Sequence, residues 1–121
     1  MAGISIISFQ NHPPVHLEHG HESEALRDMD YLKIKKSALV LRALNHKLRQ
    51  LILKTIDEHK RITVTELYVK LRLEQSVASQ HLAILRKAEI VNTVREGKFI
   101  FYTINEKRIA EINKFVQNLV G

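Results

Sequence analysis

The sequence contains no cysteine, so neither disulfides nor thiol chemistry can be part of its function. No apolar run approaches the roughly 20 residues that a membrane-spanning helix needs. The first twenty residues also lack the positively charged start and the long apolar core of a secretory signal. We therefore expect a cytoplasmic protein, and no motif in the chain indicates a cofactor.

Basic residues are scarce at the start of the chain and abundant after it. Residues 1–30 hold one arginine against five acids, a net charge of −4, whereas the other residues hold eighteen lysines or arginines against eight acids, a net of +10. A basic body with a pI near 9.7 is typical of a protein that binds phosphates. Charge alone is equally compatible with a generic basic soluble protein.

The length of 121 residues fits one domain with a single core. Residues 1–23 contain Pro13-Pro14 and Gly20 without a sustained period, so we interpret them as a flexible tail before a domain at residues 24–121. Apolar residues at helical spacing predict a first helix over residues 24–44 and a second over 47–59, with Asn45 as the N-cap of the second. In the second helix, one face is expected to carry Leu48, Leu51, Ile52 and Ile56.

The next two segments have the pattern of two short helices around a tight turn. Thr63 and Glu66 have capping-box spacing, which predicts a helix over residues 63–72, and a further helix is expected over 73–88. In the helix expected over residues 73–88, Ala78, Leu82 and Leu85 form the apolar stripe. The stripe leaves a polar face of short side chains pointing outward: Gln75, Ser76, Ser79, Gln80 and Ala83.

A β-hairpin and a final helix complete the pattern. Residues 90–95 and 98–104 are rich in β-forming residues, with Glu96-Gly97 at the bend and Arg95 and Lys98 flanking it. Asn105 is suited to cap the last helix. The chain is thus predicted to be mainly α with a β-hairpin wing, a winged helix-turn-helix in the order ααααββα, whose second short helix fits the DNA major groove.

The chemistry of the polar face agrees with contact to DNA. Gln can bond bidentately to adenine, and Ser can donate to or accept from several bases. A solvated helix face, the alternative, usually carries Glu and Lys pairs, and this face has no acid after Glu74. We therefore expect Gln75, Ser76, Ser79 and Gln80 to meet base edges, and Arg95 and Lys98 to meet phosphate or the minor groove.

The first and last helices carry apolar stripes that the core of the predicted winged helix-turn-helix does not need. They predict a surface for a partner, although packing within the chain explains the periodicity equally well. The residues of this candidate interface are Leu26, Met29, Ile109, Ile112, Val116 and Leu119.

Residues 43–104 resemble the ArsR-type (ArsR/SmtB) transcriptional repressors. The resemblance rests on Thr65-Glu66-Leu67, on a Ser-x-His-Leu-x-x-Leu core that begins at Ser79, and on the wing sequence from Arg95 to Tyr102, and it is carried also by Leu71, Gln75, Ser76 and Ala88. It implies a homodimer, with the first and last helices at the interface, that binds an inverted-repeat operator. Glu89 departs from the family pattern, which usually has Gly there.

The positions at which family members bind metals are not matched. Metal-sensing members have a Cys-x-Cys pair where this chain has Tyr68 and Lys70, and others use Asp and His ligands on the last helix, where residues 105–121 offer only Glu106 and Glu111. Imidazole is a common metal ligand, and four histidines lie close together in the tail. These are His12, His16, His19 and His21, and an incidental cluster without a metal is the simpler interpretation.

These observations favour a sequence-specific DNA-binding transcriptional regulator, a homodimeric repressor of non-metal type. The alternatives are a winged-helix module that binds another protein, or a metal sensor that uses the tail histidines. An enzyme is not expected. Ser76, Ser79 and His81 share one helix with no acid placed to orient the histidine.

Overall fold

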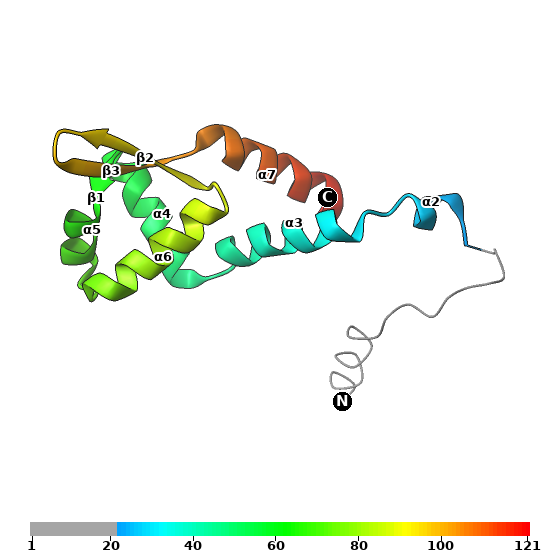
Figure 1. Cartoon of the computed structure of the whole chain (residues 1–121), viewed down its shortest axis with the longest axis horizontal. Helices are drawn as coiled ribbons and strands as arrows, with labels where there is room; N and C mark the ends of the chain where they lie inside the picture. The colour runs from blue at the N-terminus through cyan, green and yellow to red at the C-terminus, as the bar shows by residue number, and fades with distance from the viewer. Residues whose placement is uncertain (1–21) are drawn as a thin grey trace, which may run out of the picture. The chain divides into compact units, whose positions relative to one another are not determined.

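The computed structural model describes residues 22–121 (Figure 1), and these belong to two compact units that meet in the sequence between Tyr31 and Leu32. The single helix predicted over residues 24–44 is wrong. It is two helices, α2 (Glu24–Arg27) and α3 (Tyr31–Leu44). Asp28 ends α2 and a turn bond from Met29 N to Leu26 O follows. Two aspartates within three residues disfavour a helix interior, because Asp competes for backbone hydrogen bonds.

Helix α4 (Lys47–His59) supplies one wall of the core of the second unit. Its N-cap is His46, whose Nδ1 accepts from the amides of Leu48 and Arg49, so the prediction of Asn45 as the cap is wrong. The Asn45 amide donates to Leu41 O instead and so closes the end of α3. Ile52 and Ile56 are fully buried as expected, whereas Leu51 is 46% exposed and does not share their face.

The two short helices are α5 (Val64–Leu71) and α6 (Gln75–Lys87). The capping box is present, because Thr63 Oγ1 accepts from the Glu66 amide and Glu66 accepts from the Thr63 amide. Arg72 adopts a left-handed conformation, with φ of 57°, and ends α5 in the turn. The predicted stripe of α6 is confirmed: Ala78, Leu82 and Leu85 are all buried.

Three antiparallel strands form a small sheet in the order β1-β3-β2. Strands β2 (Val91–Glu96) and β3 (Phe99–Ile104) are the predicted hairpin, but its turn lies one residue later than expected, at residues 97–98. Gly97 provides the positive φ of 61° that this turn requires. The additional strand β1 (Ile62–Thr63) was not predicted, since two residues carry no periodicity; it pairs with Tyr102 and Phe101.

Helix α7 (Glu106–Val120) follows the sheet, with Asn105 as its N-cap as predicted. Ile109 and Ile112 are half-buried and pack against the core. The buried centre of that core is shared among α3, α4, β1, α5, α6 and β2: Ala43, Ile52, Ile56, Ile62, Leu67, Leu82, Leu85, Ile90 and Val91. The fold class is confirmed: a mainly helical winged helix-turn-helix with a β-hairpin wing.

Glu89, the departure from the family pattern, stands at the exit of α6 with φ of 62°. The Ile90 amide donates to Leu85 O and the Glu89 amide to Arg86 O, which is a Schellman ending with Glu89 at its left-handed position. The chain therefore adopts the conformation that Gly favours without having Gly there.

Glu89→Gly should raise the free energy of unfolding by about 0.5–1 kcal/mol. A side chain in the left-handed region costs about 1–2 kcal/mol, and the added entropy of Gly in the unfolded chain offsets part of that gain. Urea unfolding would measure the change, with Glu89→Ala as the matched control. A stabilisation by Ala as large as that by Gly would point to the lost charge rather than to the backbone.

Candidate nucleic-acid interface

Helix α6 presents the polar face that the sequence indicated. With Ala78, Leu82 and Leu85 turned into the core, Gln75, Ser76, Ser79, Gln80 and Ala83 are all exposed. None of the polar side chains among them makes a hydrogen bond to another residue of the described range 22–121. Their amide and hydroxyl groups are thus available to an external ligand with donors and acceptors of its own.

The same face becomes basic toward the end of α6. Arg86 and Lys87 occupy its last turn and follow Ser79 and Ala83 at three- and four-residue steps. With Tyr102 of β3 these four residues line a hollow of 410 Å³. The sequence prediction missed both basic residues, although their spacing from Ser79 places them on the polar face.

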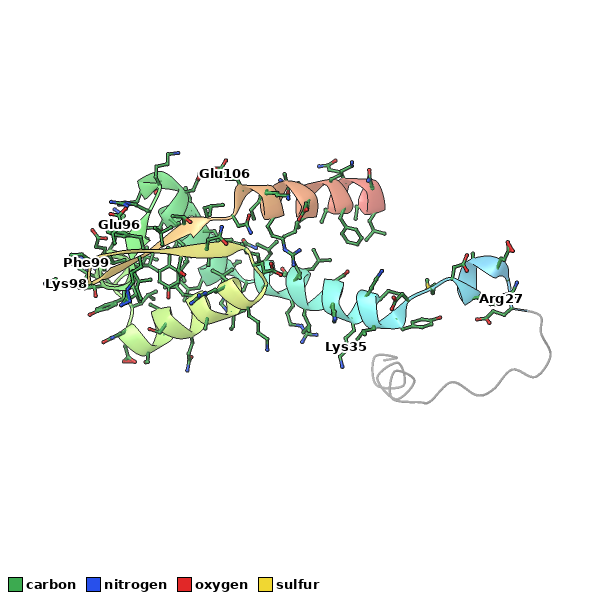
Figure 2. The ribbon with its side chains drawn as sticks, turned by 45° about the horizontal axis from the view of Figure 1, so that its top comes forward. Arg27, Lys35, Glu96, Lys98, Phe99 and Glu106 are labelled. Atoms are coloured by element: carbon green, nitrogen blue, oxygen red, sulfur yellow. The ribbon has the colours of Figure 1, made fainter. Side chains whose placement is uncertain are left out.

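The wing carries basic residues at two different places. Arg95 pairs across the hairpin with Ile100, and side chains alternate along a strand, so Arg95 shares a face with Tyr102, which borders α6. Lys98 lies in the turn itself, at the tip of the wing next to Phe99 (Figure 2). Its Nζ is 5.5 Å from the centre of the Phe99 ring.

An ion pair neutralises the acid at the wing tip. Arg61 donates a hydrogen bond to Glu96, and its guanidinium carbon lies 4.1 Å from the centre of the Phe101 ring. The hydrogen bond from Arg61 lowers the pKa of the Glu96 carboxyl below its ordinary range. Arg61 immediately precedes β1, and no pattern in the sequence singled it out.

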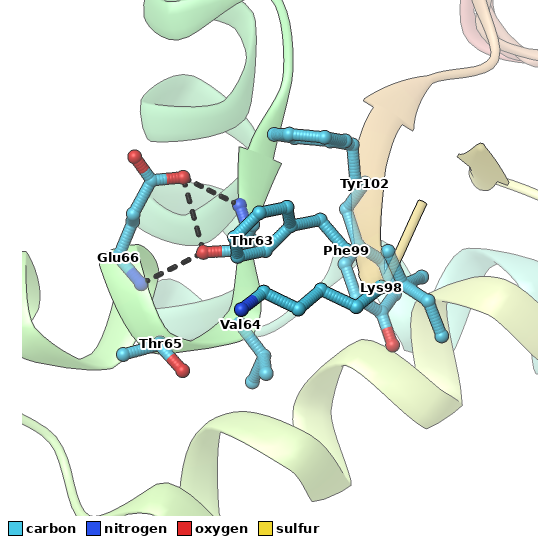
Figure 3. A pocket seen from close by; sticks show the side chains of 9 residues that line it. Thr63, Val64, Thr65, Glu66, Lys98, Phe99 and Tyr102 are labelled. Atoms are coloured by element: carbon cyan, nitrogen blue, oxygen red, sulfur yellow. Dashed lines mark hydrogen bonds between the residues drawn. The ribbon is translucent and has the colours of Figure 1, made fainter. Parts of the chain in front are cut away.

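A groove of 620 Å³ separates the wing from the start of α5 (Figure 3). Lys98, Phe99 and Tyr102 line one side of it, and the first turn of α5 lines the other. The Thr63–Glu66 bonds fix that first turn and lower the pKa of Glu66, because its carboxylate accepts from the Thr63 backbone and side chain. The wing and the helix pair are therefore held next to each other by β1, which connects directly to α5.

The residues predicted for a partner surface are divided between two environments. Ile109 and Ile112 contact the core of their own chain. Leu26 and Met29 are each 47% exposed, and Val116 and Leu119 are exposed on α7. Over the described residues 22–121, no helix is long and apolar enough to cross a membrane. Within the same residues no three potential metal-ligating side chains gather at one place, and the four tail histidines lie outside this range.

Comparison with known proteins agrees with this geometry. Residues 46–93 match the family described as "Bacterial regulatory protein, arsR family". An uncharacterised HTH-type transcriptional regulator of Methanocaldococcus jannaschii is 37% identical over 87 residues, covering 72% of this chain and 98% of the relative. The transcriptional activator HlyU of Vibrio cholerae is 31% identical over 94 residues, covering 78% of this chain and 85% of HlyU.

The transcriptional repressor PagR of Bacillus anthracis is similar in both sequence and structure. The sequences are 31% identical over 88 residues, 73% of this chain and 88% of PagR. The PagR crystal structure superposes with a TM-score of 0.58 and covers 72% of this chain and 99% of the PagR chain. The polar face of α6, the basic wing and these similarities together identify the chain as a member of the ArsR family of winged helix-turn-helix DNA-binding transcriptional regulators.

Proposed function

We propose that this protein is a homodimeric repressor of non-metal type that binds an inverted-repeat operator. The observation that carries the proposal is the acid-free polar face of α6, which lies beside a basic wing. PagR is named a repressor and HlyU an activator, so family membership leaves the direction of regulation open. We infer repression from the resemblance of residues 43–104 to the repressors of the family.

The proposed contacts fall into two classes. Gln75, Ser76, Ser79 and Gln80 read base edges in the major groove, because their free amides and hydroxyls match the donors and acceptors there. Arg86, Lys87, Arg95 and Lys98 bind phosphates or the minor groove, because the first two are exposed in the last turn of α6 and the other two are exposed on the wing. The first class gives sequence preference, and the second gives affinity without preference.

The proposed dimer uses α3 and the outer part of α7. Both helices expose large apolar side chains, which a single soluble chain would otherwise leave in water. On α3 and α7 these exposed residues are Tyr31, Leu32, Ile34, Leu39, Phe115, Val116, Leu119 and Val120. We therefore assign Val116 and Leu119 to the partner surface, and place Ile109 and Ile112 behind them as its support. Leu26 and Met29 are kept as candidates for the dimer interface only because they are exposed.

The proposal of a non-metal regulator rests on residue chemistry. Tyr68 and Lys70 occupy the helical positions at which the resemblance predicts thiolates, and neither replaces a thiolate as a ligand of a soft metal. We also propose that the protein acts in the cytoplasm and without enzymatic activity. A winged-helix module that binds only proteins is the competing function, and DNA titration distinguishes the two.

DNA binding should be sequence-specific and salt-dependent. With about six to ten phosphates neutralised per dimer, log affinity against log salt should fall with a slope of about −5 to −9. Gln80→Ala should reduce the preference for the selected sequence about tenfold, whereas Lys98→Ala should weaken all sequences alike. Fluorescence anisotropy would measure both, with Lys54→Ala as the control for a lost charge outside the α6 face and wing. A flat salt dependence without sequence preference would refute DNA recognition.

Arg61→Ala should weaken binding to every DNA sequence by about threefold to tenfold, because the unpaired Glu96 at each wing tip then repels phosphates. Removing that charge in the double variant Arg61→Ala, Glu96→Gln should restore most of the affinity. The titration is the same as for the single variants. If the double variant binds as weakly as Arg61→Ala, Arg61 itself contacts DNA and the neutralising role is wrong.

Val116→Glu should break the dimer. A charge placed in an apolar interface costs about 3 kcal/mol or more, which is roughly a hundredfold in the dissociation constant. Sedimentation equilibrium at micromolar concentration would measure the change, with the neighbouring Gln117→Glu as the matched control. A wild-type chain that sediments as a monomer would contradict the proposed dimer.

Saturating zinc should leave the affinity for DNA unchanged, in the full-length chain and in a chain that lacks residues 1–22. Each chain is titrated with DNA in the presence of zinc and of a chelator. A zinc-induced loss of more than about tenfold, roughly 1.4 kcal/mol of coupling, seen only in the full-length chain, would make the tail histidines a metal sensor instead.

A further inference from the structure

Arg49 is a buried arginine that closes the end of α3. The residue is 7% exposed, with Nε donating to Ala43 O at 2.7 Å and Nη2 donating to Arg42 O at 3.2 Å. These carbonyls belong to the last turn of α3, where a helix leaves acceptors without partners in the helix itself. No carboxylate among the described residues forms an ion pair with Arg49, so the negative end of the α3 dipole is the counter-charge.

The remaining donor of Arg49 faces the recognition helix. Its Nη1 lies 3.2 Å from Nδ1 of His81 on α6. A guanidinium can only donate, so this hydrogen bond requires an unprotonated Nδ1, with the ring proton on Nε2. One side chain of α4 therefore bonds the end of α3 and the middle of α6 at the same time.

His81 lies between a residue of the exposed polar face of α6 and a residue of its buried stripe. The preceding Gln80 is exposed on the proposed groove-facing side, and the following Leu82 is buried in the core. His81 itself is half-buried, and its ring centre lies 4.9 Å from that of His46, the N-cap of α4. Loss of the bond between His81 and Arg49 would therefore let the polar face of α6 move relative to α3, a helix of the proposed dimer.

We propose that Arg49 and His81 form a proton-sensitive positioning pair that holds α6 in the orientation required for sequence-specific binding and releases it at acid pH. The inference rests on the proposed function and gives it a regulatory input. Neutral His81 accepts from Arg49. Protonated His81 loses the acceptor and places a second positive charge against the guanidinium, so the pair separates.

The charges around His81 set the direction of the response. Burial lowers the pKa of His81, and the nearby His46 and Arg49 lower it further. The neutral, bonded form therefore prevails in the folded chain at pH 7. Because the folded pKa is below the unfolded value of about 6.5, the contribution to stability is complete above that pH. It declines as the pH falls toward the folded pKa.

The test compares affinities for two DNA duplexes between pH 8 and 5.5 at constant ionic strength. One is the duplex that the wild-type chain selects from a random pool, and the other is a scrambled duplex of equal length. In the wild type the ratio of the two affinities should fall at least about tenfold from pH 7.5 to 5.5. His81→Asn keeps an acceptor but does not titrate, so its ratio should change by less than about threefold.

Two further variants separate the pair from its surroundings. His46→Asn keeps an N-cap acceptor and removes the other histidine, so the pH response should persist. Arg49→Lys keeps the charge but cannot make the three bonds together, so the ratio should be low at every pH while circular dichroism shows a folded chain. A pH response in His81→Asn equal to that of the wild type would overturn the proposal, as would a constant ratio in the wild type.

Hydrogen exchange tests the pair without DNA. After correction for the intrinsic pH dependence, exchange of the α6 amides should accelerate at acid pH in the wild type but not in His81→Asn. If no DNA sequence is selected while this difference is present, the proposed DNA-binding function fails and the positioning pair stands. If α6 exchanges alike in both proteins, the pair is refuted.

Discussion

The burial of one stripe of α6 is the constraint on which the rest of the structure depends. Leu82 and Leu85 are completely enclosed with Leu67 of α5 and Ile52 of α4, and any rotation of α6 would expose them to water. Full burial of a Leu side chain contributes about 1.5–3 kcal/mol. The stripe therefore fixes which side chains α6 presents outward, and a functional face is maintained by residues that never touch the ligand.

Negative charge is scarce along that face after Glu74, the N-cap of α6. No acid lies among the outward residues of α6, and Glu96, the acid of the wing, is held by Arg61. Arg49 shows the converse arrangement, since a positive charge inside the domain is balanced by helix carbonyls rather than by a carboxylate. The positive charge on the surface thus stays available to a negatively charged ligand, while the buried positive charge of Arg49 holds the end of α3 in place.

Periodic and local signals were sufficient for most of the fold. The stripe of α6, the capping box at Thr63 and the cap at Asn105 each depend on a few neighbouring residues, and each was predicted correctly. The break between α2 and α3 was missed because the apolar pattern continues across the two aspartates. His46 was missed because histidine is an uncommon cap, and its Nδ1 serves here in place of a carboxylate or hydroxyl.

What sequence reasoning could not supply is contact between distant residues. Arg61 with Glu96 and Arg49 with His81 join residues that are 35 and 32 positions apart, and no spacing rule connects them. Arg86 and Lys87 differ, because helical spacing from Ser79 would have placed them on the polar face.

The shortness of β1 has a consequence for how the domain folds and opens. Its two residues pair with Tyr102 and Phe101, so the strand closes a long loop that contains both α5 and α6. Closing such a loop costs entropy before any contact stabilises it. The helix pair and the inner half of the hairpin should therefore form together, in one cooperative step. From Phe101 toward the wing tip the hairpin has only two strands, so this outer half can fray while the core remains intact.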